Sequence, residues 1–426
     1  MYPDTEPHPA VSVAPDLVLL PSLASLDEAE APGHDGGPTI LGLGLLRRTI
    51  MAARRAGYGR VFFLGRDRAV PPDTTAIPDW DHLADALLPY RATSLVIAPA
   101  TVLGETAWLE KLRTLPNEPS GWAATRQGVI VLSATAVPAL VRTGGEPFTI
   151  AAVRQRLGTR FGAPRSLPSG IDPMVVTTPK NVRLAEQRLL RSLVKETDGF
   201  MARHVERPIS LQITRQLALT DIKPTQVTMV SMAIGLCGAL FFLSPLWSWQ
   251  TLGALLFLLH SIVDGCDGEL ARLKFQESRY GGILDFWTDN IVHVAVFGCM
   301  AVGWALSSAA AWPLLLGAAA ILGTFGSAGF VYWRQMRGRE GSFTSVSATP
   351  DLPLARLLDA ASRRDFIYLV VVLALFGKSS WFLILAAVGA PAYFFLLVLL
   401  AARERPQARP AESGAQSIRA TGLSDH

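Results

Sequence analysis

Four aspartates stand out in this sequence as residues whose type and spacing could do chemistry. Asp264 and Asp267 are three residues apart, and Asp285 and Asp289 are four residues apart. On α-helices, residues at these spacings share a face, so each pair would present two carboxylates to one side. The mostly polar connection 273–280 could join two neighbouring helices and bring all four carboxylates together.

A cluster of this kind predicts a metal site. The carboxylates repel one another, and each aspartate near a bilayer costs roughly 2.5–3.5 kcal/mol on insertion scales. One or two bound divalent cations would remove both costs, and hard oxygen ligands suit Mg²⁺ or Mn²⁺. A helix end with surface carboxylates would explain any one aspartate, but not the whole pattern in register.

The residues around the aspartates favour a phosphate-bearing ligand. Gly268, Ala271 and Gly281 have little or no side chain, so a nucleotide could approach the backbone closely. Arg272 offers a permanent, fork-shaped cation that matches a phosphate group. We therefore expect these four residues to bind the nucleotide.

Long apolar segments are the elements that must position these residues. The 426 residues are 50% hydrophobic and 17% charged, below the roughly 25% charged residues of ordinary soluble proteins, and the mean hydropathy is +0.31. This composition excludes a disordered chain and disfavours a purely soluble enzyme. Six windows approach the roughly 20 residues that cross a bilayer, at 227–243, 247–263, 290–306, 311–333, 365–376 and 381–401.

Six transmembrane helices would place the aspartates and both termini on one side. The connections 244–250 and 307–313 contain no Lys or Arg, and the last outer loop contains only Lys378. The opposite connections are rich in Arg and Lys. By the positive-inside rule, both termini and the active site face the cytoplasm, in a multi-pass protein of the cell (inner) membrane. Six buried helices of a soluble bundle are the alternative.

The first half of the chain has the pattern of a soluble α/β domain. Short apolar runs predict strands at 17–20, 61–64, 94–98 and 128–132, and amphipathic stretches predict helices at 45–56 and 107–115. Such alternation is typical of a layered fold with a largely parallel sheet.

Four regions follow from these patterns. We expect a cytoplasmic α/β domain over residues 1–185, because residues 1–16 lack the apolar core of a cleavable signal. Residues 186–222 interleave Arg and Lys with apolar residues, which predicts an amphipathic segment along the membrane surface. The six-helix domain covers 223–401. The tail 402–426 is rich in Pro, Ala, Ser and Gln, which predicts disorder.

The aspartate region also carries a family resemblance. The pattern D-x2-D-G-x2-A-R-x8-G-x3-D-x3-D resembles the signature of the CDP-alcohol phosphotransferases (also called CDP-alcohol phosphatidyltransferases). It is met in full here, by Asp264, Asp267, Gly268, Ala271, Arg272, Gly281, Asp285 and Asp289. The resemblance covers roughly residues 195–401 and includes the number of helices.

The resemblance implies a reaction. The first three aspartates, and in part Asp289, would hold two metal ions on the diphosphate of a CDP-linked donor. Asp289 would be the base that deprotonates the acceptor hydroxyl, and CMP would leave. This agrees with the logic of a two-metal displacement. One position departs from the family: Thr225, in the segment 224–228, stands where members often have Asn.

The chain as a whole resembles two-domain archaeal enzymes in which an inositol-phosphate cytidylyltransferase precedes an inositol-phosphate transferase. Residues 38–65 resemble the early helix and strand of a nucleotidyltransferase fold. An active nucleotidyltransferase needs a glycine-rich loop after its first strand, but residues 21–27 contain no glycine. The metal-binding aspartate expected after 94–98 is replaced by Pro99-Ala100-Thr101. We therefore expect a degenerate, catalytically inactive domain.

Other candidate residues carry weaker signals. Arg203, Arg334 and Arg363 are candidates for binding a phosphate of the acceptor, and charge anchoring at the lipid interface is the alternative. His260 and His293 fit hydrogen-bonded packing better than metal ligation. The three cysteines show neither a disulfide framework nor zinc-ligand spacing.

The sequence thus predicts an integral-membrane, metal-dependent CDP-alcohol phosphotransferase of phospholipid biosynthesis. Its partners would be a CDP-alcohol donor, a hydroxyl acceptor (a lipid or a polyol phosphate), membrane lipids and, by the resemblance, a second copy in a homodimer. The mild net charge of +4 gives no sign of nucleic acid. Two alternatives stay open: a CDP-inositol-dependent synthase of a soluble polyol phosphodiester, and an inactive membrane scaffold or transporter. The scarcity of Lys disfavours the first, whose known setting is heat-loving archaea; a missing aspartate would have favoured the second.

Overall fold

The structure is a computed structural model of the whole chain. It describes residues 16–20, 38–64, 74–77, 80–87, 94–114, 122–133, 149–167, 173–194, 199, 201–336 and 366–403. By its internal contacts the chain divides into two compact units. The first comprises Met1–Glu196, Leu211–Ile222 and Glu269–Gln276; the second comprises Thr197–Ser210, Lys223–Gly268 and Glu277–His426.

The first unit is built on a seven-stranded sheet in the order β5-β4-β1-β6-β8-β7-β9. Strand β1 pairs in parallel with β4 and β6, and of the six described pairs in this sheet only β6–β8 and β7–β8 are antiparallel. The prediction of a largely parallel sheet is therefore confirmed. The strands are β1 Asp16–Leu20, β4 Val61–Leu64, β5 Thr75–Ile77, β6 Ser94–Pro99, β7 Trp122–Ala124, β8 Ile130–Ser133 and β9 Arg165–Ser166.

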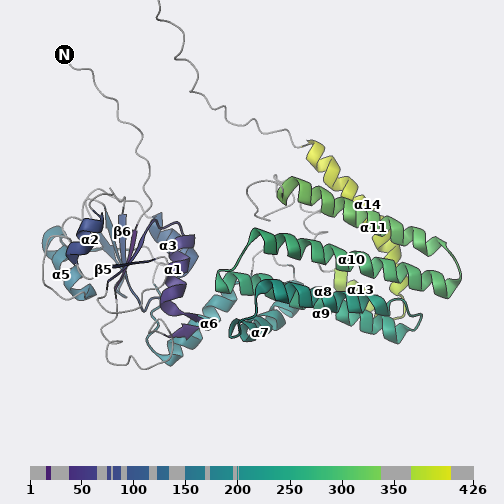
Figure 1. The fold of residues 1–426 in the computed structure, drawn as a ribbon, viewed down its shortest axis with the longest axis horizontal. Helices are drawn as coiled ribbons and strands as arrows, with labels where there is room; N and C mark the ends of the chain where they lie inside the picture. Colours follow the sequence, from purple (N-terminus) through teal and green to yellow (C-terminus); the bar gives the residue numbers. More distant parts are fainter. Residues whose placement is uncertain are drawn as a thin grey trace, which may run out of the picture. The chain divides into compact units, whose positions relative to one another are not determined.

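Helices cover both faces of this sheet (Figure 1). Helices α1 (Leu45–Arg55) and α3 (Thr106–Arg113) pack on one face, over buried residues such as Leu17 and Phe63. Helices α2 (Trp80–Leu87) and α5 (Ile150–Phe161) pack on the other face. Strand residues alternate between the two cores because successive side chains point to opposite faces. A short hairpin of β2 (Thr39–Ile40) and β3 (Leu43–Gly44) leads into α1.

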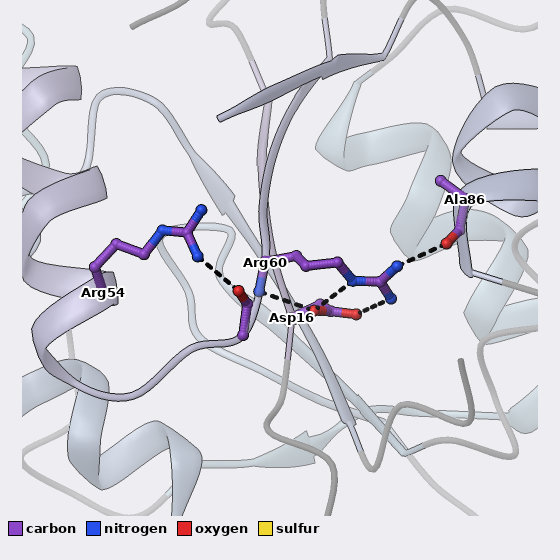
Figure 2. A network of polar contacts seen from close by, with 5 residues as sticks. Asp16, Arg54, Arg60 and Ala86 are labelled. Carbon is purple, nitrogen blue, oxygen red and sulfur yellow. Dashed lines mark hydrogen bonds and ion pairs between the residues drawn. The ribbon is translucent and has the colours of Figure 1, made fainter. Parts of the chain in front are cut away.

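A partly buried ion pair fixes the start of strand β1. Figure 2 shows Arg60, which precedes β4, donating from Nη2 to Oδ2 of Asp16 at 2.6 Å and from its backbone N–H to Oδ1. A second guanidinium nitrogen donates to the carbonyl of Ala86 at 2.8 Å. Asp16 begins β1, at the opposite end from the carboxyl ends of the strands, where ligands bind in such sheets. Asp16 therefore stabilises the sheet. It does not replace the metal-binding aspartate that a nucleotidyltransferase would have after strand 94–98.

The first unit also contains the C-terminal end of the aspartate-bearing helix α9 (Trp247–Lys274) and of helix α7 (Arg207–Ala218). Arg48 of α1 is 2% exposed and donates to the carbonyls of Ile40 and of Leu273 in this part of α9. Its guanidinium lies over the ring of Phe275, 5.9 Å from the centroid. Burial lowers the pKa of Arg48 from 12.5 to about 10, so the group is still charged at neutral pH.

Two further contacts hold this end of α9. Glu269 is fully buried and accepts a hydrogen bond of 2.6 Å from Thr214 on α7. Lys274 donates to the carbonyl of Thr220. A Cβ at Gly42 would overlap the carbonyl of Ala218, and the φ of +72° at Gly42 also favours glycine. The predicted domain boundaries at residues 185 and 222 stay predictions, but these contacts place the last turns of α9 in the first unit.

The second unit is a helical bundle. Within the described residues, five helices are long and apolar enough to cross a membrane, and Phe366–Leu375 is a shorter apolar helix. The six predicted segments all fall on helices, but the sixth crossing, by the ten residues of α13, stays a prediction. The helices are α8 Pro224–Phe241, α9 Trp247–Lys274, α10 Arg279–Ser308, α11 Trp312–Val331, α13 Phe366–Leu375 and α14 Ser379–Arg403.

Small residues let these helices approach closely. A Cβ at Gly238 of α8 would lie 3.0 Å from the carbonyl oxygen of Gly253 on α9. Helix α10 contributes Val292, Val296 and Met300 to the buried core of the bundle. Close backbone packing of this kind is typical of membrane helices, between which the hydrophobic effect supplies no attraction. The disordered tail was predicted to begin at residue 402, but α14 continues to Arg403 because the apolar helix is longer than its predicted span. The rest of that tail, from residue 404, lies outside the described residues.

Candidate active site

Helices α9 and α10 carry the four aspartates, two on each helix. Helix α9 has 28 residues and is about 42 Å long, more than the roughly 30 Å hydrocarbon core of a bilayer. Asp264 and Asp267 lie on its C-terminal half. Helix α10 begins after Ser278, whose hydroxyl accepts a hydrogen bond of 3.0 Å from the backbone N–H of Gly281. This N-cap fixes where the helix starts and therefore the phase of Asp285 and Asp289.

Three of the four carboxylates form one cluster. One carboxylate oxygen from each of Asp264, Asp267 and Asp285 lies within 4.8 Å of the other two. Asp264 and Asp267 are 2% and 7% exposed, and Asp285 is half-buried. Three carboxylates at this separation repel one another strongly where water is scarce. Their oxygen atoms are the hard ligands that Mg²⁺ and Mn²⁺ prefer, so the donor set fits a divalent cation.

A third helix contributes a residue that the sequence did not single out. The hydroxyl of Thr228, on α8, donates a hydrogen bond to Oδ2 of Asp267. Thr228 is 2% exposed and follows Pro224, which starts α8, by four residues. The hydroxyl orients one carboxylate of the cluster. In the sequence, only the likeness of the segment 224–228 to the family's pattern points to Thr228.

Asp289 lies in a different setting from the other three. It is not part of the three-carboxylate group among the described residues. Its Oδ1 lies 3.6 Å from Nε2 of His260 on α9. The other ring nitrogen of His260 lies 2.9 Å from the carbonyl oxygen of Ser231 on α8. The packing role expected for His260 thus includes a polar approach to Asp289. The ligand role predicted for Asp289 stays a prediction.

The remaining motif residues follow along the same helices. Gly268 and Gly281 are half-buried, Ala271 is buried and Arg272 is half-buried. Ala271 and Arg272 lie on α9 in the part that belongs to the first unit. Glu269, which lies between Gly268 and Ala271, accepts a hydrogen bond from Thr214 and is not in the three-carboxylate group. Nucleotide binding by these residues stays a prediction.

The candidate acceptor residues lie apart from this motif in the sequence. Arg203 is exposed in the short π-helical segment Ala202–Glu206, and Arg334 is exposed in a second such segment, Tyr332–Met336. Arg363 lies outside the described residues. A role for these arginines in binding the acceptor stays a prediction.

Cys266 and His293 have packing environments. Cys266 is fully buried, and its thiol lies 3.5 Å from the carbonyl oxygen of Ser210. The ring of His293 meets Phe257 edge-on at 5.5 Å and Phe366 at 5.5 Å. The packing role expected for His293 stays a prediction.

The apolar bundle and its buried carboxylates define a multi-pass membrane protein with a site suited to a divalent cation. Comparison with known proteins gives the class. Residues 222–389 match the sequence profile of a family described as CDP-alcohol phosphatidyltransferase. This stretch, which holds all four aspartates, is a domain of that family.

Two curated relatives have the same name, bifunctional IPC transferase and DIPP synthase. The protein from Rubrobacter xylanophilus is 37% identical over 187 residues, which are 43% of this chain and 41% of the relative. The protein from Thermococcus kodakarensis is 39% identical over 118 residues, 28% of this chain and 26% of the relative. The chain therefore matches less than half the length of these relatives.

One solved structure with a likeness to the chain is that of Mycobacterium tuberculosis phosphatidylinositol phosphate synthase with CDP-DAG bound. It is 20% identical, covers 50% of this chain and 100% of the synthase, and has a TM-score of 0.32.

Proposed function

We propose that this chain is an integral-membrane transferase that moves a substituted phosphate from a CDP-linked alcohol to the hydroxyl of an acceptor, with release of CMP. The observation that carries the proposal is the grouping of Asp264, Asp267 and Asp285 within 4.8 Å at the junction of α9 and α10. The match of residues 222–389 to the CDP-alcohol phosphatidyltransferase family supports it.

Asp264, Asp267 and Asp285, and in part Asp289, would hold the metal, Mg²⁺ or Mn²⁺, as a pair of ions. When bound, the cation would neutralise the diphosphate of the donor and the charge that develops as CMP leaves. The three carboxylates supply the negative charge that keeps the cation in place. Thr228 holds the Asp267 carboxylate in one orientation.

The proton-transfer role falls to Asp289. Its side chain is 15% exposed and lies one helical turn after Asp285, on the same face of α10. In the proposed reaction this carboxylate takes the proton of the acceptor hydroxyl. The resulting oxygen nucleophile forms a bond to the phosphorus beside the donated alcohol, and the bond from that phosphorus to the CMP oxygen breaks. Arg272 and the small residues Gly268, Ala271 and Gly281 would receive the CDP group.

The proposed product is a phospholipid or its phosphorylated precursor, made at the cytoplasmic face. Arg203, Arg334 and Arg363 are proposed to bind the phosphate of the acceptor. A second candidate is the transfer of inositol phosphate from CDP-inositol to a polyol phosphate. The likeness to the two bifunctional relatives favours this second candidate. An assembly as a homodimer and a cytoplasmic position of both termini complete the proposal.

A panel of donors and acceptors tests the proposal. Purified full-length protein is incubated with Mg²⁺, one CDP-alcohol and one acceptor, and CMP is measured. Transfer from CDP-diacylglycerol supports the lipid product, and transfer from CDP-inositol supports the second candidate. CMP release by wild type but not by Asp264→Ala is the expected result. No acceptor-dependent CMP from any donor would contradict the proposal.

A further inference from the structure

The end of the bundle opposite to the aspartates contains a cavity of about 200 Å³. One water molecule needs only about 10–15 Å³ of such space. The walls come from the segment that follows α8, the start of α9, the end of α10 and the connection between α13 and α14. Gln250 on the wall precedes Asp264 on α9 by 14 residues, which is about 21 Å along a helix. The cavity is therefore separate from the three-aspartate site.

Polar side chains line this cavity although the helices around it are apolar. Gln250, Ser307, Ser379 and Ser380 all lie on its wall. Trp247, which also lines the cavity, begins α9 and is 59% exposed. Amphipathic rings of this kind settle at the level of the lipid headgroups. The cavity thus offers hydrogen-bonding groups where the bundle meets the headgroups of a bilayer.

The hydroxyl of Ser379 is buried without a partner. Ser379 is 3% exposed, and its Oγ makes no hydrogen bond within the part of the chain that the structure describes. Although Ser379 is the first residue of α14, this hydroxyl therefore does not cap the helix. A buried polar group without a hydrogen bond is unfavourable. A ligand oxygen in the cavity that accepts from Ser379 removes this penalty.

Charge at this end of the bundle favours an anionic ligand. The first N–H groups of a long helix have no acceptor within the helix, and they form the positive end of its dipole. Helix α14 has 25 residues and begins on the wall of the cavity with Ser379. Lys378, just before it, is exposed. No Asp or Glu occurs in the three connections at this end, and Lys378 is their one cationic residue: 244–250, 307–313 and 376–380.

We propose that this cavity binds the phosphate group of a membrane phospholipid. The hydroxyl of Ser379 and the first N–H groups of α14 donate to the phosphate oxygens, and Lys378 supplies the counter-charge. Exposed apolar side chains flank this pair of residues and provide a surface for the acyl chains: Leu375, Phe376 and Trp381. The inference goes beyond the transfer reaction and does not depend on it.

Native mass spectrometry of the delipidated full-length protein tests the proposal. EDTA is present throughout, because the aspartate site cannot hold a phosphate without a cation. Three probes are titrated: dioctanoyl-phosphatidylglycerol, dioctanoylglycerol, which lacks the phosphate, and inorganic phosphate, which lacks acyl chains. Wild type is expected to bind the phosphatidylglycerol more tightly than either of the others. Ser379→Ala should weaken this binding about tenfold, through loss of a hydrogen bond to a charged group, and Lys378→Met about threefold.

Thermal stability distinguishes a ligand site from a structural role. Without lipid, the melting temperature of Ser379→Ala should equal or exceed that of wild type, because the hydroxyl has no partner to lose. Phosphatidylglycerol should raise the melting temperature of wild type more than that of Ser379→Ala, since a ligand stabilises the folded state in proportion to its affinity.

Two matched controls should behave as wild type in both measurements. Ser308→Ala removes an exposed hydroxyl from the same end of α10, at a residue that does not line the cavity. Lys180→Met removes an exposed positive charge from the first unit.

Four results would overturn the proposal. The first is equal affinity for phosphatidylglycerol in wild type, Ser379→Ala and Lys378→Met. The second is equal affinity of wild type for phosphatidylglycerol and dioctanoylglycerol, because the phosphate would then not be recognised. The third is weakened binding of inorganic phosphate, but not of phosphatidylglycerol, in Ser379→Ala, because the ligand would then be a free anion. The last is a lower melting temperature of Ser379→Ala in the absence of lipid, because the hydroxyl would then have a structural role.

Discussion

Asp289 and the three clustered aspartates differ in their surroundings. We propose that they also differ in their roles in the reaction. Asp264, Asp267 and Asp285 face one another within 4.8 Å, whereas Oδ1 of Asp289 faces His260. In the proposed reaction the three hold charge and the fourth moves a proton. The two kinds of residue should therefore fail in different ways when they are replaced.

Asp289→Asn is expected to abolish transfer while leaving the CDP-donor bound. The amide keeps the size of the side chain but cannot take the proton of the acceptor hydroxyl, and losing a general base costs about 10²–10⁴-fold in rate. Asp264→Ala should instead abolish metal-dependent binding of the donor. Equilibrium binding of a labelled CDP-alcohol, beside CMP release, distinguishes the two. Near-wild-type turnover by Asp289→Asn would show that the base is another group.

Thr228→Val tests the hydrogen bond to Asp267. Valine keeps the shape but leaves a buried carboxylate without this donor, which costs roughly 1–3 kcal/mol. We expect the metal concentration that gives half-maximal activity to rise by about tenfold, as 1.4 kcal/mol is tenfold in an equilibrium constant. Thr228→Ser, which keeps the hydroxyl, is the control. An unchanged metal requirement in Thr228→Val would remove Thr228 from the site.

At this scale the sequence predicted the pairs of aspartates but not their partners. Spacings of three and four fix which residues share a helix face, so the two pairs could be read from the chain. Thr228 and His260 reach the aspartates from neighbouring helices. Such contacts depend on how helices pack, and local spacing does not contain that information. The buried Glu269 and its hydrogen bond to Thr214 on α7 were likewise not predicted from the sequence.

The end of helix α9 is the element that joins the two parts of the motif. Its last turns, which include Ala271 and Arg272, belong to the first unit through contacts with Arg48 of α1 and with α7. The α/β unit thus holds the end of the helix that bears the first two aspartates. These contacts give the first unit a structural role that does not need nucleotide chemistry.

Arg48→Met is expected to destabilise the first unit. Two buried carbonyls, of Ile40 and Leu273, would lose a charged donor, and leaving them unsatisfied costs roughly 1–3 kcal/mol. The melting temperature of the full-length protein in detergent, followed by tryptophan fluorescence, should fall. Arg47→Met is the matched control, because Arg47 is exposed on the same helix. Equal melting temperatures for both variants would contradict this role of Arg48.

The elements themselves were predictable where their patterns were strong. The apolar runs at 17–20, 61–64 and 94–98 became strands, and the long apolar windows became helices, because burial dictates composition in both. The run at 365–376 gave a helix of only ten described residues. Arg47 and Arg48 are adjacent and identical in type, so the sequence alone could not show which one is buried.

At the scale of the whole molecule, the chain combines a stretch that matches the CDP-alcohol phosphatidyltransferase family with an α/β unit that we predict to be catalytically inactive. The relatives that it resembles are named as bifunctional, but the chain matches only 41% of the length of the first. The end of β6 and the two residues after it read Pro99-Ala100-Thr101, without an acidic metal ligand, and Asp16 is paired with Arg60. One activity, and not two, is therefore expected of the chain.

The full-length protein should not make CDP-alcohols from CTP. With Asp264→Ala blocking the transferase step, the protein is given CTP, Mg²⁺ and phosphorylated alcohols, including inositol phosphate. Pyrophosphate release should equal the rate without enzyme, since residues 21–27 offer no glycine to cradle a triphosphate. Release above that background would restore the bifunctional reading, in which the first domain supplies CDP-inositol to the membrane site.

The measurement that tests the account most directly is the metal dependence of CMP release by the purified full-length protein, with a donor that it accepts. The account predicts turnover in Mg²⁺ or Mn²⁺, its loss in EDTA and its return when the metal is restored, because three carboxylates within 4.8 Å cannot hold a diphosphate without a cation. Asp264→Ala should stay inactive at every metal concentration. Full turnover in EDTA, or by Asp264→Ala, would contradict the central claim.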